Sequence, residues 1–379
     1  MSQKSSEMKA QGIDVINMSV GEPDFMTPDH IKEAGKKAID DNYSKYSPVP
    51  GYMDLREAIS EKLAKENNLS YSAKEIIVGT GGKQGVCNAI LALVNPGDEV
   101  IIPAPYWVSY PQMVKLAGGT PVTLRTPLES DFKLTPEQLE AAITPKTKML
   151  IICSPSNPTG SVYTQDELNA LAEVVKKHDD MYVLSDEIYE HINYVGFKAS
   201  IAAAPDMKDR TIICNGVSKA YAMTGWRLGW VAAPEWIIKG MNKLQGQYTS
   251  GTNDVAQRAA LAAYKGDQQC VEDMRVAFQR RRDLIVKLAK EIPGLEVNVP
   301  QGAFYLFPHC KKLFGKSYGD YTINTSTDFA MYLLQEAHVA TVAGDAFGEP
   351  DGFRMSYATS DDNICEALRR IKEACEKLK

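Results

Sequence analysis

The stretch from Val217 to Trp230 reads VSKAYAMTGWRLGW, and the rest of the chain is organised around it. It holds Lys219 and, eight residues later, Arg227, both among small or apolar neighbours. Such neighbours strip water from an ammonium group, which disfavours its charged form and lowers its pKa. A neutral lysine amine can attack a carbonyl, and a nearby arginine can hold an anion through paired hydrogen bonds. The stretch therefore predicts a nucleophilic lysine beside an anion site, with a buried strand that carries one snorkelling lysine as the alternative.

The overall composition is typical of a soluble globular protein with more than one domain. The chain has 379 residues, 44% of them apolar and 24% charged, which is more than one ordinary core holds. A net charge of -6 gives no sign of nucleic-acid binding. No apolar run is long enough to cross a membrane, and the N-terminus lacks a signal-peptide segment. Seven scattered cysteines without a CxxC pair indicate reduced thiols, no metal site and a cytoplasmic protein.

Apolar strands alternate with helices through the first two thirds of the chain. We expect strands at residues 75–78, 100–103, 120–124, 149–153, 181–185, 211–216 and 227–233. Helices are expected between most of them, at 53–67, 84–94, 108–117, 135–142 and 164–178. This alternation predicts an α/β fold with a mostly parallel sheet, covered on both faces. Functional loops then belong at the carboxyl ends of the strands.

Beyond about residue 235 the pattern changes. Helices are expected at 235–247, 254–265 and 271–291, the last long enough to serve as a hinge. Short strands at 295–299, 303–307, 338–344 and 353–358 then mix with helices at 327–337 and 361–378. At the other end of the chain, before the alternating region, a short strand is expected at 13–20 and a helix at 29–41. The mixture predicts a second, smaller α+β domain.

A glycine-rich turn, GTGGKQG (residues 79–85), lies where a strand gives way to a helix. Glycines let the backbone approach a phosphate, and a helix N-terminus attracts one. The turn matches neither the Walker pattern nor the dinucleotide fingerprint. It predicts a phosphate site of another kind, and a plain tight turn is the alternative.

Two loops that follow apolar strands carry polar side chains. Asp186, in SDEIY, ends a strand and needs a cationic partner if it is buried. The protonated ring nitrogen of pyridoxal phosphate is such a partner, and it would account for the nucleophilic lysine as well. Tyr189 and Asn157 are placed to bond the ring oxygen of that cofactor. The alternatives are a helix N-cap at Asp186 and a ligand-free turn around Asn157.

An aromatic residue and a second arginine complete the candidate site. Trp107, in the sequence PYW, follows a strand and suits stacking on a planar cofactor, although packing is the commoner use of tryptophan. Arg354 lies within the apolar strand FRMSYA, where a substrate carboxylate or a structural ion pair would satisfy it.

Together these motifs resemble the class I and II aminotransferases, pyridoxal-phosphate-dependent enzymes of fold type I. The motifs are SKAYAMTGWRLG, SDEIY, SPSNPTG, PYW, GEPDF, KYSPVPG and FRMSYA, and the resemblance runs from about residue 12 to the C-terminus. The bacterial aspartate aminotransferase subgroup is most similar, because its phosphate turn reads GGK and a tryptophan follows the PY. The resemblance implies a homodimer with a seven-stranded large domain over residues 26–276 and a small domain over 277–379. An N-terminal segment over 1–25 would pack with the small domain.

The resemblance also implies a role for each site residue. Lys219 would bind the cofactor covalently and then move protons. Asp186 would pair with the ring nitrogen, Tyr189 and Asn157 would bond the ring oxygen, and Trp107 would stack on the ring. The phosphate would be held by Gly82, Lys83, Ser218 and Arg227, with Tyr46 reaching in from the neighbouring subunit. The substrate would be held by Arg354 at its α-carboxylate, by Gly21, Trp107 and Asn157 nearby, and by Lys83 at a distal carboxylate.

The expected activity is ping-pong transamination between L-aspartate and 2-oxoglutarate. An aromatic, prephenate or alanine aminotransferase, or a β-elimination lyase, are alternatives on the same fold. A non-catalytic ligand sensor is an alternative of another class, but we find no room for a DNA-binding segment, and Lys219, Asp186 and Arg354 are all retained. Gly216 replaces a phosphate-binding serine of the animal enzymes, as in the bacterial subgroup. Family members usually have more residues before KAQG, so we expect an incomplete or differently built lid.

Overall fold

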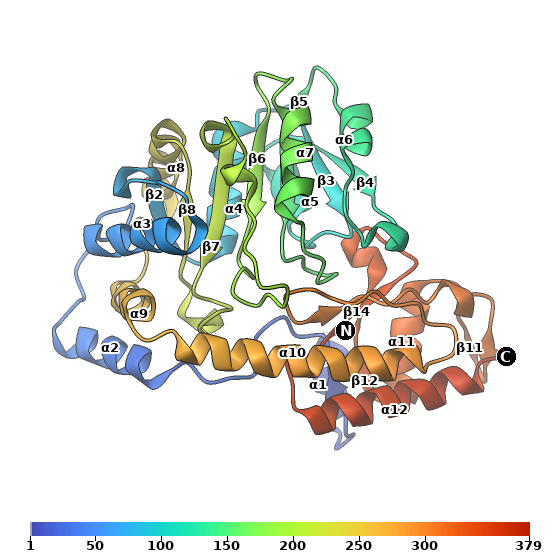
Figure 1. The fold of residues 1–379 in the computed structure, drawn as a ribbon. Coiled ribbons are helices and arrows are strands. Elements are labelled where there is room, and N and C mark those ends of the chain that lie inside the picture. Colours follow the sequence, from blue (N-terminus) through green and yellow to red (C-terminus); the bar gives the residue numbers. More distant parts are fainter. Residues whose placement is uncertain (1) are drawn as a thin grey trace.

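Seven strands form the central sheet of the computed structural model, which describes residues 2–379. They are β2 (Ile76–Gly79), β3 (Glu99–Ala104), β4 (Thr120–Arg125), β5 (Thr147–Cys153), β6 (Tyr182–Asp186), β7 (Thr211–Gly216) and β8 (Gly229–Ala232). Their order is β2-β8-β7-β6-β5-β3-β4. Only β8 runs against its neighbours, β2 and β7. The predicted seven-stranded, mostly parallel sheet is therefore confirmed (Figure 1).

The stretch around Lys219 is the connection between β7 and β8, and the alternative of a buried strand through Lys219 is wrong. Gly216 ends β7 and pairs with Gly229, which begins β8 and also pairs with Gly79 at the end of β2. Because β8 is antiparallel, the connection starts and finishes at one edge of the sheet. The parallel strands have their carboxyl ends at this same edge. Lys219 and Arg227 therefore lie beside the loops that follow those strands.

Helices cover both faces of the sheet (Figure 1). On one face lie α4 (Gly82–Leu93), α5 (Tyr110–Leu116) and α8 (Glu235–Tyr248). On the other lie α3 (Met53–Asn67), α6 (Pro136–Ala142), α7 (Gln165–Val175) and α9 (Asp254–Lys265). Neighbouring strand residues point to opposite faces, so Val100 packs with α4 and α5 while Ile101 packs with α6 and α7. Both faces are buried, which explains strands that read as continuous apolar runs.

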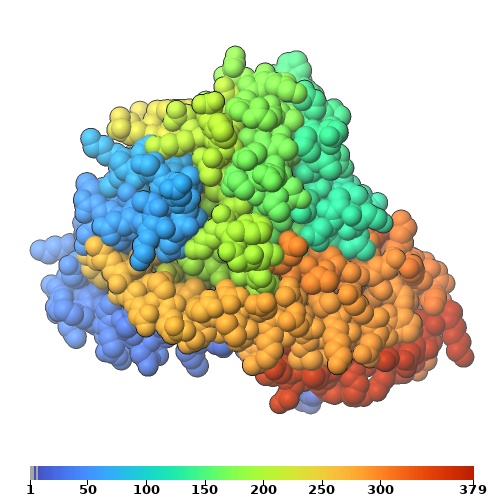
Figure 2. Space-filling model, viewed as in Figure 1, coloured from blue at the N-terminus to red at the C-terminus, as the bar shows by residue number. Residues whose placement is uncertain are grey.

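The C-terminal part forms a second layer beneath this sheet. The long helix α10 (Gln269–Lys290) runs alongside α12 (Asp361–Lys377) and leads into α11 (Ser326–Glu336) and a small antiparallel sheet (Figure 1). That sheet has the order β13-β14-β9, made of Val342–Ala343, Phe353–Ser356 and Tyr305–Leu306. A separate hairpin joins β10 (Ser317–Tyr318) to β11 (Tyr321–Thr322). Figure 2 shows this part in orange and red directly against the sheet-bearing part.

The N-terminal segment packs against the C-terminal part. It comprises α1 (Ser2–Ala10) and β1 (Ile16–Asn17), whereas α2 (Asp29–Asp40), which follows after a turn, packs on α9 of the sheet-bearing part. Strand β1 pairs in parallel with β12 (Val339–Ala340), and Val15 packs on Leu334 and Ala340. The predicted domain boundary at 276/277 falls inside α10, and the division into domains stays a prediction. No helix within residues 2–379 is long and apolar enough to cross a bilayer.

Four predicted strands differ clearly from the structure. The strand expected at 303–307 shortens to β9, and the one expected at 338–344 divides at Thr341 into β12 and β13, which belong to different sheets. The strand expected at 13–20 shortens to Ile16–Asn17, because the side chain of Asn17 accepts hydrogen bonds from the Ser19 backbone and hydroxyl. The strand expected at 295–299 does not form. There Glu296 makes an isolated bridge to His309, while the Asn298 side chain donates to Asp131 at 2.9 Å. Pro300 then removes a backbone donor. Around Asn17 and Asn298, side-chain bonds compete with a longer strand ladder, although the Met18 backbone N–H still donates to the Ala340 carbonyl at 2.9 Å.

Candidate active site

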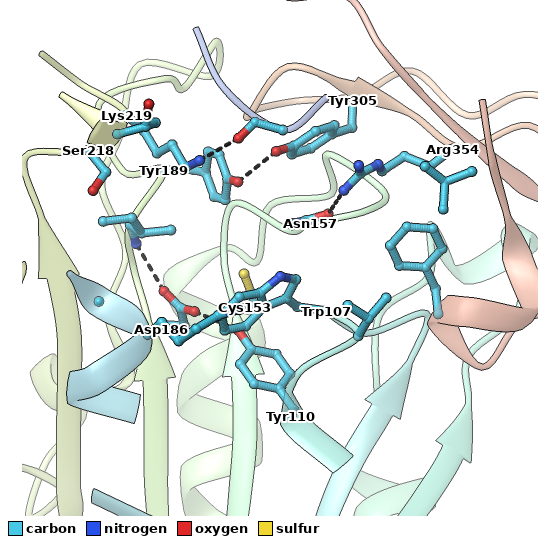
Figure 3. A pocket seen from close by; sticks show the side chains of 18 of the residues that line it. Trp107, Tyr110, Cys153, Asn157, Asp186, Tyr189, Ser218, Lys219, Tyr305 and Arg354 are labelled. Atoms are coloured by element: carbon cyan, nitrogen blue, oxygen red, sulfur yellow. Dashed lines mark hydrogen bonds between the residues drawn. The ribbon is translucent and has the colours of Figure 1, made fainter. Parts of the chain in front are cut away.

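A cavity of about 460 Å³ opens at the carboxyl edge of the sheet. Its walls come from the ends of β5, β6 and β7, the start of α4, the loop after β3, and the N- and C-terminal parts (Figure 3). Eleven of the twelve predicted site residues line it: Gly21, Gly82, Lys83, Trp107, Asn157, Asp186, Tyr189, Ser218, Lys219, Arg227 and Arg354. The twelfth, Tyr46, does not line the cavity and is fully exposed. The fold thus gathers residues that lie up to 333 positions apart in the sequence, from Gly21 to Arg354.

Lys219 projects into the cavity, where its Nζ donates a hydrogen bond to the backbone carbonyl of Gly21 at 2.5 Å. Burial, with a smaller contribution from the nearby cations of Arg354 and Arg227, lowers the pKa of Lys219 to about 8, against the opposing charges of Glu22 and Asp186. The direction is the one the sequence predicts. A substantial fraction of the amine is neutral close to physiological pH, as a nucleophile requires.

Asp186 is the last residue of β6, and its buried carboxylate faces the same cavity. One oxygen accepts from the Tyr110 hydroxyl at 2.6 Å, and the other accepts from the Ile188 backbone N–H at 3.3 Å (Figure 3). Burial raises the pKa of Asp186, and these two hydrogen bonds work in the opposite direction. Within residues 2–379 no cationic side chain forms an ion pair with it. The carboxylate therefore suits a cationic group of a ligand.

The start of α4, Arg227 and Ser218 line one part of the cavity together. A Cβ atom at Gly81 would lie 2.5 Å from Nη2 of Arg227, and one at Gly229 would lie 2.3 Å from the backbone nitrogen of Gly82. Only glycine allows the two backbones and the guanidinium to come this close. Backbone N–H groups at a helix N-terminus, a hydroxyl and a guanidinium are the donor set that phosphate prefers.

Arg354 occupies the opposite wall, in strand β14. Its Nη1 donates to Oδ1 of Asn157 at 2.9 Å, and its Nη2 donates to the Ser19 carbonyl at 2.7 Å. The guanidinium lies over the Tyr305 ring, 4.5 Å from the centroid, and 5.1 Å from that of Phe347. Its Nε is buried without a hydrogen-bond partner. A cation that keeps an unused buried donor at a cavity wall suits a carboxylate ligand.

Several cavity residues were not predicted from the sequence. Tyr110 follows Trp107 by three residues and meets its ring edge-on, and its hydroxyl bonds Asp186. Tyr305 accepts or donates a 2.8 Å hydrogen bond with the Tyr189 hydroxyl. Phe347 and Cys153 also line the wall. The spacing of Tyr110 from Trp107, one helical turn, was an available signal, whereas Tyr305 reads in the sequence as part of an ordinary apolar strand.

Lys83 lies beside Trp107, with its Nζ 5.0 Å from the centroid of the indole ring. Both residues line the cavity, as predicted. The ammonium group is thus held over an aromatic face at the cavity rim. A second anionic group of a ligand would find a cation there, in addition to Arg354.

Comparisons with known proteins agree with this geometry. The family model described as aminotransferase class I and II matches residues 13–371. An aspartate/prephenate aminotransferase of Cereibacter sphaeroides is 51% identical over 99% of this chain and 94% of its own length. The crystal structure of an aspartate aminotransferase from Rhizobium meliloti superposes with a TM-score of 0.97 at 46% identity, covering 100% of this chain and 95% of that one. The aspartate aminotransferase of Thermus thermophilus with maleate has a TM-score of 0.92 at 41% identity, covering 98% and 95%.

Proposed function

The chain belongs to the class I and II aminotransferases, and from this we propose that it transfers the amino group of L-aspartate to 2-oxoglutarate with pyridoxal 5'-phosphate bound at Lys219. Enzymes of this family use that cofactor. The observation that carries the proposal is the convergence of a partly buried lysine of lowered pKa, a buried carboxylate without a cation and two arginines on one cavity.

The residues present fit pyridoxal phosphate at both of its ends. Asp186 would pair with the ring nitrogen, and the start of α4 with Ser218 and Arg227 would hold the phosphate. Tyr189 and Asn157 are the candidates for the ring oxygen, and Trp107 for the ring face. When bound, the cofactor supplies an aldehyde for amine capture and a protonated ring that accepts the negative charge developed at the substrate carbon.

The remaining cavity residues would bind and orient the amino acid. Arg354 would take the α-carboxylate through its unused Nε and a guanidinium that Asn157 holds in place at 2.9 Å. Lys219, displaced from the Gly21 carbonyl, would remove the proton at the substrate Cα and deliver it to the carbon of the bound cofactor that carries the amino group. The first substrate leaves as a 2-oxo acid before the second binds, which gives ping-pong kinetics.

Lys83 supports an acidic substrate, because it provides a cation for a second carboxylate at the cavity rim. Prephenate is a second candidate acceptor, since the relative from Cereibacter sphaeroides is named an aspartate/prephenate aminotransferase. Aromatic or alanine transamination and β-elimination have no comparable support among the contacts of the cavity.

A cytoplasmic homodimer is part of the proposal. Tyr46 lies on a loop and is fully exposed. This exposure leaves the side chain free to contact a second copy of the chain, as the family resemblance implies. In the proposed dimer, Tyr46 of each subunit would reach the phosphate bound by the other.

Reconstitution with pyridoxal phosphate tests the proposal. Wild-type protein is expected to bind one cofactor per chain, to absorb visible light and to transaminate aspartate. Lys219→Ala should lose the visible band and about 10⁴-fold or more of kcat, because the nucleophile and proton carrier is one group. Lys239→Ala is the control, since this lysine is 70% exposed on α8. A wild-type protein that stays colourless would refute the proposal, and a panel of aspartate, alanine, aromatic amino acids and prephenate would rank the substrates.

A further inference from the structure

A charged cluster joins the end of the central sheet to the segment that carries Arg354. Arg125, the last residue of β4, donates from Nε and Nη2 to the two oxygens of Glu349, each at 2.7 Å. Nη2 also bonds Asp351, to which Lys311 donates at 3.0 Å. The Glu349 side chain is fully buried although that of Arg125 is 53% exposed. We call Arg125, Glu349 and Asp351 the Arg125 clamp, and none of the three lines the cavity.

The segment held by the clamp is packed tightly against the loop after β3. The Tyr106 backbone N–H donates to the Phe347 carbonyl at 3.0 Å. A Cβ atom at Gly348, whose φ is +74°, would lie 2.5 Å from the Tyr106 ring. One at Gly344 would lie 2.0 Å from the Glu349 carbonyl oxygen. Because these contacts leave no free space, a shift of Glu349 would move the whole turn from Gly344 to Glu349.

The same segment supplies much of the substrate wall of the cavity. Val342 and Phe347 line the cavity, and Arg354 lies opposite Val342 in the β13–β14 pair. Phe347 contacts the guanidinium of Arg354. A displacement of Glu349 would consequently alter three cavity residues, while Lys219, Asp186 and the start of α4 rest on the central sheet.

We propose that Arg125 is a positioning residue for the substrate: by clamping Glu349 it holds residues 342–354 in the geometry that binds the substrate carboxylate. This rests on the proposed function of Arg354. Two parallel charge-assisted hydrogen bonds fix orientation as well as distance. Without Arg125, the fully buried Glu349 carboxylate keeps only the Asp351 backbone N–H at 3.2 Å, with Nε2 of His309 3.9 Å away. A movement of the segment that hydrates this carboxylate would then lower the free energy. Only a fraction of the molecules is then competent, and the apparent Kd rises in inverse proportion to that fraction.

The test is Arg125→Gln in the cofactor-loaded enzyme, with maleate as a non-reacting dicarboxylate. We expect the Kd of maleate and the KM of aspartate to rise about tenfold, with kcat changed less than about twofold, because the competent fraction alone falls. Cofactor content and the visible band should match wild type. Arg125→Lys should recover part of the loss, since it keeps the charge but not the paired geometry.

Arg369→Gln is the matched control. Arg369 is 54% exposed and bonds Glu366 at 2.7 Å and Glu373 at 2.5 Å, but it lies on α12. We expect it to leave the Kd of maleate unchanged. Wild-type affinity and KM in Arg125→Gln would overturn the proposal. If that variant does not fold, Arg125→Lys takes its place, with an increase of at least about threefold expected and wild-type values again overturning the proposal.

Hydrogen exchange separates failure of this proposal from failure of the proposed function. The backbone amides of Tyr106, Gly344 and Glu349 donate to Phe347, Gly352 and Gly344 respectively. In Arg125→Gln these amides should exchange several-fold faster than in wild type, whether or not the protein binds cofactor. Unchanged exchange would refute the clamp. A wild-type protein that binds neither pyridoxal phosphate nor maleate would instead refute the proposed function.

Discussion

The two sides of the cavity are built in different ways. The cofactor side stands on the central sheet: Asp186 ends β6, and Lys219 lies in the connection between β7 and β8. The substrate side stands on the β13-β14-β9 sheet, whose strands have two to four residues, and on the N-terminal segment. Its geometry depends on contacts between distant parts of the chain, such as Arg354 with Asn157 and Arg125 with Glu349.

This difference indicates a division of labour. Residues on a sheet buried on both faces have little freedom, which suits a group that must hold one cofactor throughout the reaction cycle. Residues held by a few polar contacts between distant segments can shift at smaller cost, which suits a wall that must admit and release substrates. The comparison predicts that changes on the cofactor side lower kcat for all substrates alike. Changes at the groups that bind the substrate should act on Kd and KM, and should discriminate among substrates where only some of them carry the group that is bound.

After Lys219→Ala, the largest effect is expected for Asp186→Asn on the cofactor side. Loss of the negative charge would remove the partner of the protonated ring and lower kcat about 10²–10³-fold for every amino acid tested. Steady-state kinetics with aspartate and alanine measures it. Tyr110→Phe is the control, because it removes only the hydroxyl that donates to Asp186 at 2.6 Å, and it should cost far less. A loss confined to one substrate would break the comparison.

A smaller effect concerns protein stability. Burial of the Lys219 ammonium group, which lies on the cofactor side, lowers the free energy of unfolding. The pKa of this group is about 8 in the folded chain, against the ordinary value of 10.5. Between these values the unfolded chain binds more protons, so wild-type stability rises with pH across that window. In cofactor-free protein, Lys219→Met should therefore increase the free energy of unfolding by about 3 kcal/mol at pH 7. The gain should shrink as the pH rises from 8 towards 10.5, as urea unfolding would show, and a gain independent of pH would contradict the assignment.

The smallest effect is expected for Lys83→Ala, because Lys83 is anchored on α4 but is proposed to bind the distal carboxylate of the substrate. Removal of the cation over Trp107 should reduce kcat/KM for aspartate about tenfold and leave alanine nearly unchanged, since only aspartate has a distal carboxylate. The two substrates are compared in one preparation, so that changes in cofactor content cancel. Equal losses for both would mean that Lys83 acts on the cofactor side, through the phosphate.

Much of the fold was predictable because its signals are local. The strands of the central sheet read as apolar runs, and α3 begins and ends as expected at residues 53 and 67. The strands expected at 13–20, 295–299 and 338–344 were the main failures. The Asn17–Ser19 bonds are local and could have been anticipated, whereas the bond from Asn298 to Asp131 joins residues 167 positions apart. Tyr305 was missed for a similar reason: its bond to Tyr189 joins residues 116 positions apart.

The sequence by itself determined which kinds of side chain form the site. They are a lysine among apolar residues, a carboxylate after a buried strand, and arginines in apolar surroundings. These follow from short-range patterns of burial and charge. Only the tertiary structure decided how they meet. It placed Lys219 against the Gly21 carbonyl, left Asp186 without a cation, and bound Arg125 to the buried Glu349. The physical reason is that such contacts join segments far apart in the chain, and their distances depend on how the sheet and the C-terminal part pack together.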